Sequence, residues 1–256
     1  MIPIPENRVF SFDAVQLSLD PAEHPWVIAE RTAIADNWAR DQIERPWLFN
    51  GTVLLHRGLQ LEDGVISGTS HRAPYAALRQ LVATMPDADA SADADADAWH
   101  LFGSALIVTS DDAMLLIRMA AKTANPGKVY APAGSLDESD ITNGAVDVGG
   151  SILREAREET GLDLSGADTE NRLLGWRSGR LVAVFRRFRM AEPADVLVER
   201  MREHIRTDPE QEIADVVVVR SPDDAGPSAP PYMQAMIDFH FAAAELNSGW
   251  QADGKR

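Results

Sequence analysis

The sequence predicts an α/β (α+β) fold in which a mixed sheet lies between helices, preceded by a smaller N-terminal α/β region. Runs of alternating apolar residues, typical of strands, lie on both sides of one strongly helical stretch that a glycine follows directly. Strands flanking a central helix favour a layered sandwich. With 256 residues and 45% hydrophobic content, the chain can bury a sizeable core.

Composition excludes several function classes. The chain contains no cysteine, which rules out disulfide bonds, thiolate zinc sites and cysteine nucleophiles, and this usage fits the cytoplasm. A formal net charge of −16 repels polyanions, so we expect neither a nucleic-acid partner nor binding to an anionic membrane. Because the sequence has no long uncharged apolar run and no signal-like start, we also expect neither membrane insertion nor secretion.

The sharpest change in composition is residues 86–98, PDADASADADADA, which hold five aspartates and no large apolar residue. Such a segment cannot contribute to a core. We interpret it as a linker and not as an acidic metal-collecting tract, because evenly spaced aspartates without other ligand types are usually solvated. The predicted organisation is an N-terminal α/β region over residues 1–85, the linker over 86–98, and a larger domain with a C-terminal helix over 99–256.

Before the linker, the periodicity of the apolar residues changes several times. Alternation predicts a strand over residues 10–19, and looser helical spacing follows over 21–43. Residues 48–72 are predicted to form strands broken at Asn50-Gly51 and Asp63-Gly64, and residues 75–85 a short helix.

After the linker, paired strands surround the central helix. The predicted elements are a hairpin over 104–119, a strand over 128–135, the helix over 147–160, a second hairpin over 172–190, a helix over 199–205, a strand over 213–219 and a closing helix over 232–246. Gly161 suits the left-handed conformation in which many helices end.

The central helix carries the residues with the clearest chemistry. Glu155, Glu158 and Glu159 stand at relative positions 0, +3 and +4, which places three carboxylates on one helical face. Like charges at this spacing repel, so either Arg154 and Arg157 neutralise them on an ordinary solvated helix, or divalent cations do. Oxygen ligands of this kind suit Mg²⁺ or Mn²⁺.

The sequence on either side of this helix favours the second alternative, in which divalent cations neutralise the three glutamates. A strand ending in Ala133-Gly134 is followed by an acidic loop, the helix and Gly161-Leu162, and this arrangement resembles the Nudix box, G-x5-E-x7-R-E-U-x-E-E-x-G-U, over residues 134–162. The second half matches from Arg154 to Leu162. The only departure there is Ala156, which is small where a bulky apolar residue is usual.

The first half of the box departs more. Gly134 matches the opening glycine and Asp140 stands where the first glutamate belongs, but thirteen residues in place of seven then precede Arg154. Asp147 is the other candidate for that acidic position. The six inserted residues are ITNGAV, residues 141–146, and a ligand cluster confined to the helix is compatible with a longer loop.

The resemblance implies roles for particular residues. Arg154 would hold a glutamate in position, and Mg²⁺, with Mn²⁺ as an alternative, would be bound by the three helix glutamates Glu155, Glu158 and Glu159 with help from the Ala133 carbonyl. The general base would be a glutamate not fully engaged by metal, such as Glu158, or one on a later loop. Among the later carboxylates we favour Glu212 over Glu210, although acidic loop ends are often plain solvated surface.

The implied activity is hydrolysis of a diphosphate linkage in a small nucleotide-like substrate by magnesium-activated water. A weaker similarity is to the animal UDP-glucose pyrophosphatase branch of the family, over residues 45–51, 71–81 and the long loop after Gly134. It implies a UDP-sugar as substrate, beside ADP-ribose or another nucleoside diphosphate derivative. The alternative is a non-catalytic nucleotide-binding regulatory module, which has less need of the complete set of charged box residues.

Two features of the N-terminal region allow more than one interpretation. Trp26, Trp38 and Trp47 could stack on a base, but large aromatic residues at such spacing are usually core residues, and we expect core positions for them. The N-terminal region is compatible with a role in capping the substrate and with a role in forming a homodimer.

Overall fold

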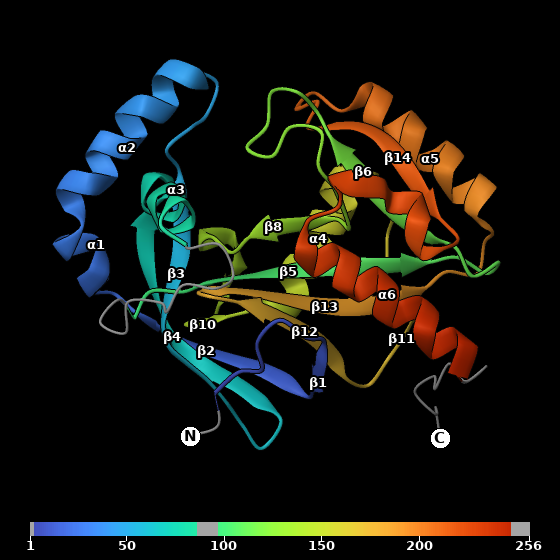
Figure 1. Cartoon of the computed structure of the whole chain (residues 1–256), viewed down its shortest axis with the longest axis horizontal. Helices are drawn as coiled ribbons and strands as arrows, with labels where there is room; N and C mark the ends of the chain where they lie inside the picture. Colours follow the sequence, from blue (N-terminus) through green and yellow to red (C-terminus); the bar gives the residue numbers. More distant parts are fainter. Residues whose placement is uncertain (1–2, 86–96, 247–256) are drawn as a thin grey trace.

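The larger of two sheets forms the centre of the molecule (Figure 1). The structure is a computed structural model that describes residues 3–85 and 97–246. The main path across this sheet is β1 (Phe10–Phe12), β12 (Leu173–Ser178), β13 (Leu181–Arg189), β5 (His100–Val108), β6 (Met114–Met119) and β14 (Ile213–Val219). Shorter strands pair at its sides: β7 (Val129–Tyr130) with β6, β8 (Ala133–Ser135) with β5, and β11 (Asp168–Thr169) with β13. β5 and β13 run parallel and the other neighbours antiparallel.

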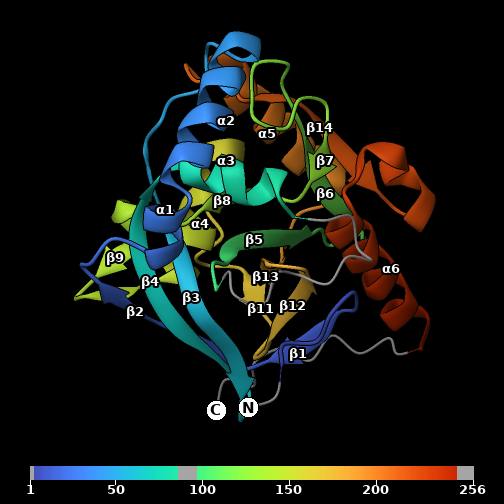
Figure 2. The same ribbon diagram turned by 60° about the vertical axis from the view of Figure 1, so that its left-hand side comes forward.

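Helices lie on both faces of this sheet. α4 (Val148–Thr160) packs against β5 and β8, α5 (Ala194–Thr207) against β14, and α6 (Pro231–Leu246) contacts β12. A 3-10 helix, η2 (Pro222–Ser228), precedes α6. Figure 2 shows α4 and α6 on opposite sides of β5 and β13. The predicted sheet between helices is therefore confirmed.

The smaller sheet belongs mainly to the N-terminal region. Its strands, in order, are β3 (Thr52–Glu62), β4 (Val65–Pro74), β2 (Ala14–Asp20), β10 (Ala145–Val146) and β9 (Ile141–Thr142). Its helices are α1 (Pro25–Ala29), α2 (Arg31–Glu44) and α3 (Tyr75–Ala83). The helical spacing noted over 21–43 corresponds to two helices, because Glu30 between α1 and α2 leaves helical geometry.

The two sheets share one hydrophobic core. Along β3, Leu54 faces the main core, while Val53 and Leu55 face a second core beneath α1, α2 and α3. This alternation is the two-residue period of a strand buried on both faces. The smaller sheet is therefore a layer between the N-terminal helices and the main core.

Each sheet also includes a strand from the other part of the chain. β1, from the N-terminal region, pairs with β12, and β10, from the loop before α4, pairs with β2 through Ala145 and Ser18. The division into residues 1–85, 86–98 and 99–256 stays a prediction. Residues 86–96 of the predicted linker lie outside the described residues, whereas Asp97 accepts a hydrogen bond from the Gly58 amide at 2.9 Å and Ala98 is buried.

Several other elements differ from expectation in their bounds. The strand predicted over 128–135 is divided into β7 and β8 around Pro132, which cannot donate a ladder hydrogen bond. α5 begins at Ala194, five residues before the predicted helix. Within the described ranges, no helix is both long and apolar enough to cross a membrane.

The first prediction concerns the turn between β9 and β10. Gly144 has φ +81°, so Gly144→Ala should lower the free energy of unfolding by about 1 kcal/mol. A Cβ on Gly149 in α4 would make only an ordinary contact, 3.5 Å from Asp147 Oδ1, and Gly149→Ala should raise the free energy of unfolding by about 0.5–1 kcal/mol. Urea unfolding measures both, and shifts of the same sign would contradict the assigned conformations.

The second prediction concerns pH. Burial and the nearby His100 lower the pKa of His56 to about 3, so this histidine is neutral in the folded state. Its unfolded form binds a proton below about pH 6.5, and folding stability should fall by up to about 1.4 kcal/mol per pH unit as the pH drops from there toward 3. His56→Gln should remove this part of the slope in urea unfolding. Ser70→Ala, which removes only the hydroxyl 2.9 Å from His56 Nδ1, should keep it.

Candidate functional site

The site is built around α4, whose two ends are fixed by local interactions. The Asp147 side chain accepts a hydrogen bond from the Gly150 amide at 2.8 Å, and Gly161 ends the helix with φ 72°. The apolar face of α4 lies close against β5, where a Cβ on Gly103 would come within 2.5 Å of Ile152. Ala156 is fully buried on the same helix, and its small side chain suits a closely packed face.

The six inserted residues form a hairpin whose two ends lie side by side. Residues 141–146 form the β9–β10 hairpin, and at its base the Asp147 amide donates a hydrogen bond to the Asp140 carbonyl at 2.8 Å. The insertion therefore extends outward without separating Asp140 from the start of α4. Asp147 caps the helix, which leaves Asp140 as the acidic residue that faces it.

Arg154 connects the acidic residues of the site. Its Nη2 atom lies 3.0 Å from Asp140 Oδ1 and 2.8 Å from Glu155 Oε1, and its Nη1 atom lies 2.9 Å from Glu158 Oε2. Burial alone would lower the pKa of Arg154, but the charges of Glu155 and Asp140 raise it above its ordinary value. The guanidinium is therefore a permanent cation that holds three carboxylates.

Glu159 and Glu155 are carboxylates with too little compensating charge. Glu159 is buried and its Oε2 accepts a hydrogen bond from the Ala133 amide at 2.8 Å. Burial, reinforced by the charge of Glu155, raises the pKa of Glu159 well above its ordinary value. Burial likewise raises the pKa of Glu155 to about 7, although Arg154 opposes the shift. A bound cation would offset the cost of ionising both groups.

Gly134 is required by the position of Glu155. A Cβ added to Gly134 would overlap the Glu155 carboxylate. The β8 backbone therefore approaches α4 more closely than any other residue type would allow. This contact explains why a glycine opens the motif at this point of the chain.

Two carboxylates of α4, Glu155 and Glu159, line one cleft of about 480 Å³ together with Glu212 from a distant part of the chain. One wall comes from the loop after α2 and from α3, and the other from the loop between β6 and β7 (Figure 1). Partial burial, followed by the charges of Glu210 and Asp208, raises the pKa of Glu212. A larger hollow of about 730 Å³ between α5 and β14 includes none of these three carboxylates.

The structure brings most of the predicted site residues together. Ala133 lines the cleft with Glu155, Glu159 and Glu212, and Glu210 is not among the lining residues. Arg154 and Glu158 are not lining residues either, and the Glu158 side chain is 56% exposed beside Arg154.

Glu155, Glu158 and Glu159 are engaged with protein groups. Within residues 3–85 and 97–246, no group of three or more His, Asp or Glu is arranged to hold a metal ion. Glu155 and Glu158 turn toward Arg154, and Glu159 turns toward the Ala133 amide. The donor set still fits a hard divalent cation, because it consists of oxygen atoms with excess negative charge.

Sequence reasoning missed part of the cleft. Trp26 and Trp38 pack against the N-terminal core as expected, but Trp47 is 43% exposed and lines the cleft, so its assignment to the core was wrong. Lys122 lines the opposite wall and makes no ion pair in the described part of the chain. The sequence held one signal: of three lysines, Lys122 and Lys128 lie in a single short loop.

No family model and no curated protein matches the sequence. Solved structures of Nudix proteins are similar to it. The MutT protein from Methanosarcina mazei Go1 is 15% identical over 57% of this chain and 96% of that chain, with a TM-score of 0.39. The Nudix domain of Shewanella oneidensis NrtR, solved with ADP ribose, is 16% identical over 66% of this chain and 97% of that chain, with a TM-score of 0.39. The Nudix hydrolase RenU from M. smegmatis is 16% identical over 62% of this chain and 96% of that chain, with a TM-score of 0.40.

The third prediction tests the contact between Gly134 and Glu155. Gly134→Ala should force the partly buried Glu155 carboxylate away and lower the free energy of unfolding by about 1–3 kcal/mol, measured in the presence of a chelator. In a Glu155→Ala background the same change should cost much less, since the clashing carboxylate is gone.

Gly166→Ala is the matched control, because no atom lies within 4 Å of the added Cβ and its φ is not positive. Additive effects of Gly134→Ala and Glu155→Ala would contradict the close approach.

Proposed function

We propose that this chain is a metal-dependent Nudix-type hydrolase that cleaves the diphosphate linkage of a nucleoside diphosphate derivative, such as a UDP-sugar or ADP-ribose. The observation that supports it best is that two box glutamates, Glu155 and Glu159, line the same cleft as the distant Glu212. A cleft of about 480 Å³ is within the size range of small-molecule sites.

The metal would be held by Glu155, Glu158, Glu159 and the Ala133 carbonyl. Bound Mg²⁺ or Mn²⁺ would shield the charge of the diphosphate and lower the pKa of a coordinated water. Binding requires Glu155 to exchange its contact with Arg154, at 2.8 Å, for the cation. Asp140 is 2% exposed and would keep Arg154 in place during that exchange.

The remaining steps belong to the protein's own groups. Water attacks one phosphorus atom, the bridging P–O bond breaks, and the products are a nucleoside monophosphate and a second phosphate ester. Glu212 is our candidate to take the proton of the water, because its raised pKa brings it nearer to neutral pH and it faces the cleft. Lys122 would contact the phosphate oxygens from the opposite wall.

The fourth prediction compares substrates and variants. UDP-sugars, ADP-ribose, NADH, dinucleoside polyphosphates and nucleoside triphosphates are incubated with and without Mg²⁺, and phosphate-ester release is measured. Glu158→Gln should lower kcat by about 100-fold or more on the accepted substrate, because it removes a metal ligand and a partner of Arg154.

Glu203→Gln is the matched control. Among residues 3–85 and 97–246, the Glu203 side chain pairs only with Arg206 on the exposed side of α5, and its replacement should leave turnover unchanged. Undiminished turnover in Glu158→Gln would contradict the assigned site. Nucleotide binding by the wild type without any turnover would favour the alternative, a non-catalytic regulatory module.

A further inference from the structure

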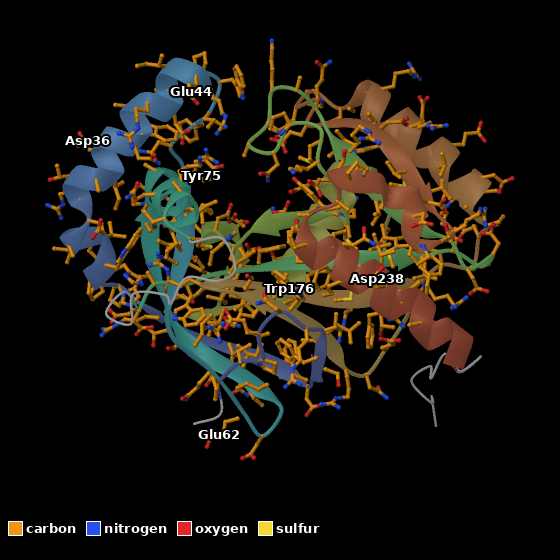
Figure 3. The ribbon with its side chains drawn as sticks, in the orientation of Figure 1. Asp36, Glu44, Glu62, Tyr75, Trp176 and Asp238 are labelled. Carbon is orange, nitrogen blue, oxygen red and sulfur yellow. The ribbon has the colours of Figure 1, made fainter. Side chains whose placement is uncertain are left out.

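Exposed hydrophobic side chains gather along one wall of the cleft. Trp47 is 43% exposed, Phe49 83% and Val82 46%, and all three line the cleft that contains the box glutamates. Leaving two aromatic side chains in water is unfavourable, and such patches commonly mark binding sites. The N-terminal region supplies this wall, on the side where Figure 3 labels Tyr75 at the start of α3.

The loop that carries Trp47 and Phe49 is held by hydrogen bonds in its middle and at its C-terminal end. Gln42 Nε2 donates a hydrogen bond to the Leu48 carbonyl at 2.9 Å. The Tyr75 amide donates to the Gly51 carbonyl at 2.7 Å, and the Asn50 side chain accepts from the Ala76 amide at 2.8 Å. The loop is therefore a fixed surface, and a ligand that binds it loses little free energy to ordering.

The two walls differ in chemistry. The N-terminal wall is largely apolar, whereas the facing side carries Glu155, Glu159, Glu212 and the ammonium of Lys122. A ligand that fits both has a flat apolar ring at one end and phosphates at the other. This description matches a nucleoside diphosphate, with its base against the aromatic wall and its phosphates beside Lys122 and the cation that the carboxylates would hold.

We propose that Trp47, Leu48 and Phe49, together with Val82, form the surface on which the substrate's nucleobase stacks, so that the N-terminal region supplies base recognition. This inference rests on the proposed function for the place of the diphosphate. A second copy of this chain is the other occupant to test, because exposed aromatic residues are also common at interfaces between subunits.

The fifth prediction uses binding and needs no turnover. UMP and AMP, which have no diphosphate linkage to hydrolyse, are titrated by calorimetry with Mg²⁺ into the wild-type protein and into Trp47→Ala and Phe49→Ala. Each aromatic replacement should weaken nucleotide binding by roughly 5- to 100-fold, the loss expected for one stacking contact. Ribose 5-phosphate, which has no base, should bind with affinity changed by less than about twofold.

Ile43→Ala is the matched control, because Ile43 is 82% exposed on the neighbouring α2 and does not line the cleft. It should leave UMP and AMP binding unchanged. Phe49 is so exposed that its replacement should not disturb folding, which a circular dichroism melt checks.

The outcomes separate this inference from the proposed function. Base-dependent binding that is lost in Phe49→Ala supports the aromatic wall even if no substrate is hydrolysed. Hydrolysis with unchanged nucleotide affinity in both variants overturns the wall and leaves the enzyme proposal standing. Absence of nucleotide binding by the wild-type protein also overturns it. So does a dimer that Phe49→Ala dissociates while the affinity for UMP and AMP is unchanged.

Discussion

The contact of Arg154 with Asp140, Glu155 and Glu158 is the interaction on which the site depends. Its guanidinium contacts Asp140 in the loop before α4 and the two glutamates on the acidic face of α4. Without this positive charge, the three carboxylates would repel one another. An arginine suits this task better than a lysine, because its planar group presents several donors in fixed directions. The acidic face of α4 is consequently ordered by the protein's own charge.

The single positive charge of Arg154 does not balance the negative charges of Asp140 and of the three glutamates of α4. In the part of the chain that the structure describes, Glu159 has only a backbone amide as a hydrogen-bond partner, and the charge of Glu155 adds to the cost of ionising it. The protein therefore keeps a locally unfavourable arrangement that a divalent cation would relieve. Such an arrangement is a common feature of functional sites, where local energetics are set by chemistry more than by stability.

The sequence predicted the elements with strong periodicity and left open those that depend on distant contacts. The bounds of β14 and α4 follow from β-branched residues and from caps that are local in sequence, and both agree with the structure. The choice between Asp140 and Asp147 could not be made from the sequence, because it depends on the hydrogen bond that closes the β9–β10 hairpin. Trp47 was assigned to the core because apolarity alone does not distinguish a buried ring from one that lines a cleft.

The insertion explains how the two regions can share one cleft. β10 pairs with β2 of the smaller sheet, and β1 pairs with β12 of the larger sheet, so each region is anchored in the sheet of the other. The proposed site takes its carboxylates from one region and its aromatic wall from the other, so it needs those parts held within about half an ångström. A flexible tether between separate domains would not meet that requirement. Strands that pair with the sheet of the other region, around a shared core, do meet it. The six residues that depart from the Nudix pattern therefore contribute, through the pairing of β10 with β2, to fixing the N-terminal region relative to α4.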